Sequence, residues 1–346
     1  MWFDSLGAKS SCLLIEYNDL CILIDPGIAV MHPSYPAPRE VKLKLRDEGY
    51  RRIREVLGKA DIVVITHYHY DHYLHEQEDI ALYKNKIILA KNPNKYINDS
   101  QRKRAEKFYS MLYRELGLRL EEVLLEPGEE EYPDIIEKLD EALSKDYGDY
   151  TSRRKQLLEQ GRKWFTRRTE KWRTYKRIPE QSIGNTKIYF VDGKVFEYNT
   201  VRLKFTEPLF HGVEYSRVGW IISVIVEAGR RKIYYTSDVN GPIIEDYASM
   251  IIDENPDILI LDGPPTYLLG YTLNQINLRR AVENATRILE ETSKLELVLY
   301  DHHLVREPKF RERTINVWRT AEKHGVKLMT VAEYMGTKPL VLQYTK

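Results

Sequence analysis

This chain of 346 residues has only two cysteines, no long apolar run and no marked excess of one charge. Its two cysteines, Cys12 and Cys21, are too few for a disulfide framework. We therefore expect a cytoplasmic protein in which both thiols are small core residues. No run approaches the roughly eighteen apolar residues of a membrane span, and the N-terminus lacks the basic-then-apolar pattern of a signal peptide. These absences argue against a membrane partner.

The formal net charge of +1 favours no class of partner. Charged residues make up 30% of the chain, and together with the scarcity of glutamine this composition resembles that of thermophile proteins. The length fits one large domain with an insertion, or two ordinary domains. The sequence contains no internal repeat, and it leaves the oligomeric state open.

Three histidines and an aspartate are concentrated in the six residues His67-Tyr68-His69-Tyr70-Asp71-His72. They follow the β-branched, apolar run 62–65, which predicts a buried strand that presents the cluster at its C-terminal end. Imidazole nitrogen and carboxylate oxygen are the ligands that divalent cations such as zinc accept. The cluster therefore predicts a metal site, in preference to a polar surface loop.

Further candidate ligands follow apolar runs later in the chain. His211 comes after 205–210, Asp238 after the predicted strand 232–236, and His302-His303 after 296–300. A single polar residue at such a place is usually a cap or a structural hydrogen-bonding group. Because they follow the first cluster in this order, these residues are stronger candidates for metal ligands as a set than each is alone.

This order, with the Asp25-Pro26-Gly27 turn upstream, resembles the metallo-β-lactamase superfamily, and in particular its archaeal members. The resemblance covers about 1–94 and 183–346. It implies an α/β fold, an αββα sandwich of two mixed sheets flanked by helices. It also implies two metal ions: the first bound by His67, His69 and His211, the second by Asp71, His72 and His302, with Asp238 bridging.

Some roles stay open at this stage. His303 is the alternative to His302 as the last ligand, since either could emerge on the metal side of the turn. Asp25 would orient the metal loop by hydrogen bonds, or would simply form an Asp turn before proline. His75 could be a proton shuttle, but a solvated or capping histidine is the favoured reading. The sequence shows no convincing general acid.

Hydrophobic periodicity predicts a mixed α/β order outside the segment 95–182. Asn18-Asp19 is expected to close a hairpin. Helices are predicted at 47–57, 274–291 and 309–324. Strands are predicted at 11–17, 20–25, 87–90, 187–191, 201–205, 219–226, 232–236, 257–261, 296–300, 326–330 and 339–344.

Residues 95–182 lack strand-like runs and predict a helical, charge-rich insertion in a domain formed by 1–94 and 183–346. Within it, 120–149 carries twelve acidic and two basic residues, and 151–177 carries eleven basic and two acidic ones, with aromatic residues interleaved. The basic stretch 153–177 could bind a nucleic-acid backbone while its rings stack on bases. We favour the alternative that two helices pair their opposite charges.

The resemblance implies a metal-dependent hydrolase whose two divalent ions activate water, with Asp71 and Asp238 orienting it. Zinc is the first candidate, and iron or manganese the alternatives. The ligand set resembles the nuclease branches such as tRNase Z, which suggests RNA or DNA as substrate. A small ester, lactone or phosphorylated metabolite, with the insertion as a lid, is the second hypothesis. A non-enzymatic, metal-stabilised protein that binds nucleic acid or another protein is the third.

Overall fold

The computed structural model describes residues 1–344. Two seven-stranded mixed sheets form its centre, and a short antiparallel pair, β10 (Leu209–Phe210) and β11 (Trp220–Ile221), lies beside them. The first sheet has the order β1 (Trp2–Phe3), β2 (Ser11–Tyr17), β3 (Leu20–Ile24), β4 (Ile62–Ile65), β5 (Ile87–Ala90), β7 (Thr186–Phe190) and β6 (Gln181–Ile183). The second has the order β16 (Lys327–Met329), β15 (Leu297–Asp301), β14 (Ile258–Asp262), β13 (Arg231–Tyr235), β12 (Val224–Ala228), β9 (Val201–Phe205) and β8 (Val195–Tyr198).

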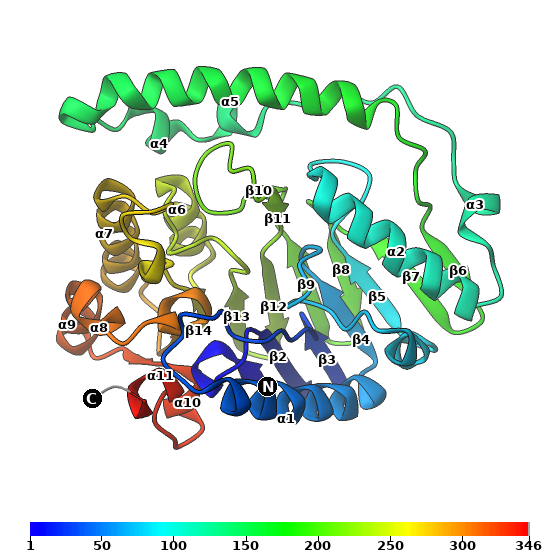
Figure 1. The fold of residues 1–346 in the computed structure, drawn as a ribbon, viewed down its shortest axis with the longest axis horizontal. Helices are drawn as coiled ribbons and strands as arrows, with labels where there is room; N and C mark the ends of the chain where they lie inside the picture. The colour runs from blue at the N-terminus through cyan, green and yellow to red at the C-terminus, as the bar shows by residue number, and fades with distance from the viewer. Residues whose placement is uncertain (345–346) are drawn as a thin grey trace.

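Helices cover the outer faces of both sheets (Figure 1). The α-helices of the described residues are α1 (Arg39–Lys59), α2 (Asp99–Glu115), α3 (Leu120–Val123), α4 (Asp140–Ser144), α5 (Thr151–Trp172), α6 (Glu245–Glu254), α7 (Gln275–Glu291), α8 (Phe310–Arg313), α9 (Ile315–His324), α10 (Val331–Tyr334) and α11 (Leu340–Gln343).

Strand alternation explains how the layers are held together. In β4, Ile62 and Val64 enter the core between the two sheets, whereas Val63 and Ile65 face the core shared with α1 and α2. In β15, Leu299 faces the inner core, and its neighbours face the helices on the other side. Strands buried on both faces read as continuous apolar runs. The predicted αββα sandwich is confirmed.

The segment 95–182 shares the core of the rest of the chain. Helix α2 packs on the first sheet with Phe108 and Leu112 fully buried. The long helix α5 crosses the molecule above β10 and β11 (Figure 1). Its Trp164 stacks on Trp220 of β11 with ring centroids 5.2 Å apart and planes at 5°. The indole Nε1 of Trp172 donates to the Ile97 carbonyl at 2.9 Å.

Charge pairing inside this segment differs from the expectation of two helices side by side. The acidic stretch holds the short helices α3 and α4 and short 3-10 turns, none of them long enough to run beside the 22-residue α5. Instead Arg154 of α5 pairs with Glu214 at 2.7 Å, and Arg168 pairs with Asp99 of α2 at 2.6 Å. Beyond the helix, Arg177 pairs with Glu130 of the acidic stretch.

Several predicted elements differ in type or extent, among them 219–226, which forms β11 and β12 in different sheets, and 309–324, which forms α8 and α9. Residues 339–344, predicted as a strand, contain the helical turn α11, because a short apolar run alone does not distinguish a strand from a buried helical turn. The helix predicted at 47–57 begins earlier, at Arg39, directly after Pro38. The hairpin at Asn18-Asp19 is confirmed, with Tyr17 paired to Leu20.

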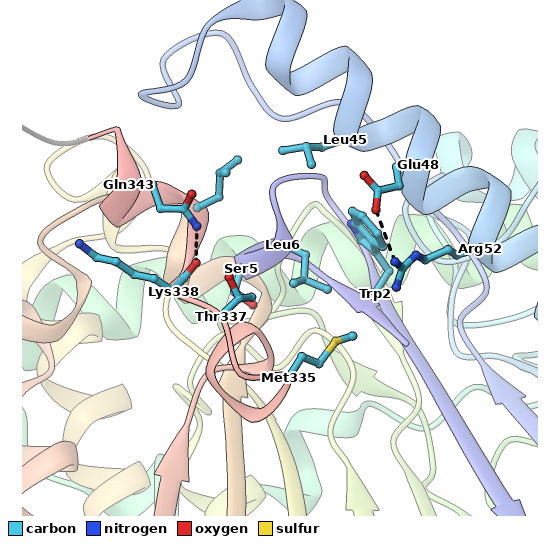
Figure 2. A pocket seen from close by; sticks show the side chains of 11 residues that line it. Trp2, Ser5, Leu6, Leu45, Glu48, Arg52, Met335, Thr337, Lys338 and Gln343 are labelled. Atoms are coloured by element: carbon cyan, nitrogen blue, oxygen red, sulfur yellow. Dashed lines mark hydrogen bonds and ion pairs between the residues drawn. The ribbon is translucent and has the colours of Figure 1, made fainter.

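A pocket of about 340 Å³ lies between the N-terminal residues, α1 and the C-terminal segment (Figure 2). Trp2, Leu6 and Met335 line it, and Glu48 pairs with Arg52 at its edge. Its lining residues are separate from the histidine cluster. Within residues 1–344, no helix has the length and apolar character needed to cross a membrane.

Candidate metal centre

The cluster 67–72 is separated from β4 by Thr66 alone and begins at the strand end that the sequence predicts. β4 is central in its sheet, paired in parallel with β3 and β5. Because strand ends of parallel neighbours meet at one edge of a sheet, ligand sites gather there. His67 and His72 are fully buried, and His67 Nε2 lies 3.0 Å from His69 Nδ1. The turn therefore directs its imidazoles toward one another instead of toward solvent.

Asp238 lies at the centre of the cluster, three residues after β13. Its Oδ2 lies 3.1 Å from His211 Nε2 and 3.5 Å from His67 Nε2. Its Oδ1 lies 3.3 Å from His72 Nε2 and 3.4 Å from His302 Nε2. The two oxygens of one buried carboxylate thus face two separate groups of histidines.

These groups are compact enough for metal binding. Ligand atoms of His67, His69, His211 and Asp238 all lie within 4.8 Å of one another, and so do those of Asp71, His72 and His302. Several converging atoms have no hydrogen-bond partner among the described residues, namely His72 Nε2, His302 Nε2 and Asp238 Oδ1. Buried polar atoms without partners are costly. Their convergence fits a cation between them.

A layer of hydrogen bonds holds the cluster from behind. Asp25 accepts from the Thr66 amide at 2.8 Å, from Thr66 Oγ1 at 2.6 Å and from Tyr235 Oη at 2.8 Å. Its Oδ2 also lies 2.8 Å from His72 Nδ1, the nitrogen that points away from Asp238. Of the two roles considered for Asp25, these contacts fit the orienting one, since hydrogen bonds of this kind hold a histidine ring in place.

Gly27 explains why the Asp-Pro-Gly turn can approach the cluster so closely. A Cβ at this position would lie 2.1 Å from the Tyr73 amide nitrogen and 2.2 Å from that of His72. No side chain fits there without moving the backbone of the metal loop. Glycine is therefore required by close packing against 71–73.

The two histidines at the end of β15 point to different partners. His302 Nδ1 lies 3.2 Å from Asp4 Oδ1, which leaves Nε2 facing Asp238. His303 Nδ1 lies 2.9 Å from Asp262 Oδ1. His302 thus completes the group with Asp71 and His72, while His303 also lies close to Asp238 and lines the adjoining cleft.

Electrostatics divide the histidines into two sets. Burial lowers the pKa of His67 and lowers that of His69 to about 3, so both are neutral. Burial also disfavours charge on His72, but the carboxylates of Asp238 and Asp25 outweigh it and raise its pKa to about 10. The pKa of His302 is raised by Asp4 and Asp238 against the same burial. A metal ion bound by this second set would have to displace their protons.

A cleft of about 340 Å³ opens onto the cluster. His69, Asp71, His211 and Asp238 lie at its base. Its other walls combine apolar and polar side chains from the loops after β10, β13, β14 and β15: Val213, Ser216, Val218, Asn240, Ile243, Pro265, Tyr267, Leu268, Thr272, Leu273, His303 and Arg306.

His75 lies apart from this arrangement. Its ring stacks on Tyr70 with centroids 3.8 Å apart, and its Nε2 lies 3.4 Å from Glu76 Oε1. Sequence reasoning missed Asp4, Asp262 and Arg306. Asp262 ends a buried strand as the other candidates do, and that position was the available signal. No sequence signal indicated Asp4, because its partners His302 and Arg306 are about three hundred residues away in the chain.

The two sheets between helices, with this cluster at their edge, define a protein of the metallo-β-lactamase fold. The family model of the metallo-beta-lactamase superfamily matches residues 7–146. The chain belongs to the UPF0282 family of this superfamily.

Two archaeal relatives carry this family name. The UPF0282 protein of Methanocaldococcus jannaschii is 30% identical, over 98% of this chain and 91% of the relative. That of Metallosphaera sedula is 29% identical, over 99% and 88%. Among solved structures, the metallo-beta-lactamase fold protein YhfI from Bacillus subtilis matches 93% of this chain and 88% of its own, with 15% identity and a TM-score of 0.41.

Proposed function

We propose that this protein is a metal-dependent hydrolase with a dinuclear centre. The position of Asp238 carries the proposal, because its two oxygens face two groups of histidines and a carboxylate so placed can bridge two ions. One ion would be held by His67, His69 and His211, and the other by Asp71, His72 and His302. The nitrogen and oxygen donors suit zinc, and iron or manganese accept the same donors.

Bound divalent ions supply a nucleophile by lowering the pKa of water and polarise a carbonyl or phosphoryl oxygen. The chain supplies the orientation. Asp25 fixes the ring of His72, Asp4 fixes that of His302, and Asp71 and Asp238 present carboxylates at the base of the cleft. Of the cleft histidines, His303 is the one not assigned to an ion here, and it would face substrate; His75 is not among the residues that line the cleft.

Phosphodiesters are the substrate class that we place first, and small esters or lactones second. Exposed arginines and lysines on α5 support an anionic substrate, among them Arg162, Lys163 and Arg167. The aromatic rings of α5 do not contribute to such binding, because Trp164 and Trp172 are buried. A cleft of about 340 Å³ accommodates a small molecule or the reacting part of a longer chain.

A cytoplasmic location accords with the two free cysteines.

Activity assays with matched variants test the proposal. The metal-reconstituted protein is assayed with bis-p-nitrophenyl phosphate, a short RNA and p-nitrophenyl acetate, before and after strong chelation. We expect hydrolysis of at least one substrate that chelation and His211→Ala abolish, while His324→Ala, at an exposed position on α9, leaves it unchanged. Hydrolysis that survives chelation would refute the metal-dependent mechanism. Bound metal without hydrolysis of any ester would favour the non-enzymatic alternative.

A further inference from the structure

The exposed side of α5 carries cations that no ion pair neutralises. Several of them have no acidic partner within residues 1–344, among them Arg153, Lys155, Lys163 and Arg167. They outnumber the two exposed acids of the helix, Glu159 and Glu170. The ion pairs that α5 does form hold it to α2 and to the loop after β10. Unpaired cations on one surface attract anions, so this side of the helix favours a polyanionic partner.

A cation from another segment joins one flank of α5. Lys163 and Arg167 lie four residues apart on the helix and therefore share that flank, and Trp164 is a surface neighbour of Arg167. Arg217, in the loop after β10, lies over the ring of Trp164, with its Cζ 4.7 Å from the ring centroid. Burial and the charges of Arg167 and Arg168 lower the pKa of the Arg217 guanidinium, in agreement with this proximity. Arg217 is exposed, so it extends the flank as a further cation.

The loop that carries Arg217 is fixed to the metal loop through α2. Its next residue, Val218, lines the cleft. Asn98 Nδ2, at the start of α2, donates to the Arg217 carbonyl at 2.9 Å and to the Val218 carbonyl at 2.7 Å. Gln101 Nε2 donates to the Val218 carbonyl at 3.0 Å, while its Oε1 accepts from the Tyr68 amide at 3.2 Å. Arg217 is thus held beside the wall of the cleft.

A further cation lies directly against the metal loop. Arg104 of α2 is partly exposed, and its Cζ lies 4.9 Å from the ring centroid of Tyr70. Its Nη1 donates to the Tyr68 carbonyl at 3.4 Å, and it forms no ion pair within the described residues. Tyr68 and Tyr70 flank His69, which lies at the base of the cleft. We refer to Lys163, Arg167, Arg217 and Arg104 as the basic rim.

We propose that the basic rim binds the phosphate backbone of a single-stranded nucleic acid and leads the strand to the cleft. The inference rests on the proposed function, because it takes the cleft as the place where the strand is cut. Guanidinium N–H groups match phosphate oxygens in geometry, and three of the four rim residues are arginines. A cleft of about 340 Å³ admits part of one chain but not a duplex. Contacts to the backbone alone carry no base sequence preference.

Fluorescence anisotropy with a labelled oligouridylate of about twelve nucleotides tests the rim, at salt concentrations between about 50 and 200 mM. The proteins are metal-reconstituted wild type, Arg217→Met, the double variant Arg167→Met/Arg217→Met and the control Arg319→Met, and a gel confirms that the probe stays intact. Arg319 is exposed on α9, so its loss changes the net charge equally. Methionine keeps an apolar side chain over Trp164.

The salt dependence gives the number of phosphate contacts. We expect the logarithm of the association constant to fall with the logarithm of the salt concentration with a slope of about −3 for wild type, the value for four contacts to a single strand. Each arginine removed should reduce the slope by about 0.7. Affinity at the lower salt should fall about fivefold for Arg217→Met and further for the double variant, with Arg319→Met like wild type.

Equal binding by wild type, the double variant and the control would overturn the inference, and so would the absence of binding by wild type at the lower salt. A duplex bound as tightly as the strand would overturn the assignment to single strands, and polyglutamate bound as tightly would overturn the assignment to phosphate. Strand binding through the rim without hydrolysis of any ester would refute the proposed function alone. Hydrolysis of bis-p-nitrophenyl phosphate without strand binding would refute the rim alone.

Discussion

Glu214 offers a quantitative test of how the insertion is attached to the rim of the cleft. It lies in the loop after β10, next to Val213 of the cleft wall, and its side chain is 7% exposed. Its Oε1 accepts from Arg154 of α5 and from Arg280 of α7, both at 2.7 Å. Arg280 also donates to Glu245 at 2.7 Å. One carboxylate therefore joins the loop, α5 and α7.

The pKa of Glu214 gives the size of its contribution to the free energy of unfolding. Burial raises the pKa of Glu214, but the two guanidinium groups outweigh burial and lower it from 4.5 to about 2. A difference of this size corresponds to about 3 kcal/mol of stability at pH 7. Replacement by glutamine leaves two buried arginines with less compensation, for which a loss of about 3–5 kcal/mol is typical. We expect Glu214→Gln to be about 3 kcal/mol less stable than wild type.

Thermal unfolding at pH 7 and at pH 3.5 measures this difference. For a chain of 346 residues, about 3 kcal/mol corresponds to a decrease in Tm of about 4 °C. Because the folded-state pKa is depressed, the stabilisation is complete above the unfolded pKa of 4.5 and is lost as the pH falls toward about 2. At pH 3.5 the gap between wild type and variant should be smaller by about 1.4 kcal/mol.

The control is Glu159→Gln, at an exposed position on α5, which should change Tm little. Equal Tm values for Glu214→Gln and Glu159→Gln at pH 7 would refute the reasoning. So would a gap that stays constant between the two pH values, since the carboxylate charge would then not be its source.

Three other substitutions test the packing around the centre. Gly27→Ala should lower both stability and metal content, because the added Cβ would lie 2.2 Å from the His72 amide nitrogen. Thermal unfolding and elemental analysis measure the two effects, and wild-type values for both would contradict the prediction. Asp25→Asn should weaken metal affinity roughly tenfold to a hundredfold, because His72 loses the hydrogen-bond partner that holds its ring. Competition with a chelator measures the affinity, and a wild-type value would count against the orienting role. Trp164→Ala should lower the free energy of unfolding by about 3 kcal/mol, because the lost ring stacks on Trp220. A decrease below about 1 kcal/mol would show that this contact does not hold α5 in place.

Much of the fold could be predicted because the buried strands carry an unambiguous pattern. The runs at 62–65 and 258–262 are apolar on both faces, and each ends at the polar residues that gather at the site. α11 could not be predicted in the same way, because its four residues are too few to show a helical period.

The candidate site was predictable where its residues are adjacent in the chain, as in 67–72. The arrangement around it depends on contacts between distant segments. Asp4 reaches His302 and Arg306 across the whole chain length, and Asp262 reaches His303 from the neighbouring strand. The charges of α5 were visible in the sequence, but their partners lie on α2 and in the loop after β10. Composition does not identify such partners.

The most direct test of the dinuclear centre is the number of metal ions bound per chain. Wild type, Asp238→Asn and His324→Ala are reconstituted with zinc, dialysed and examined by elemental analysis. We predict about two ions per chain for wild type and for His324→Ala, and a clear loss for Asp238→Asn, whose amide cannot hold both groups of ligands together. Absence of bound metal from wild type after reconstitution with zinc, iron or manganese would contradict the account.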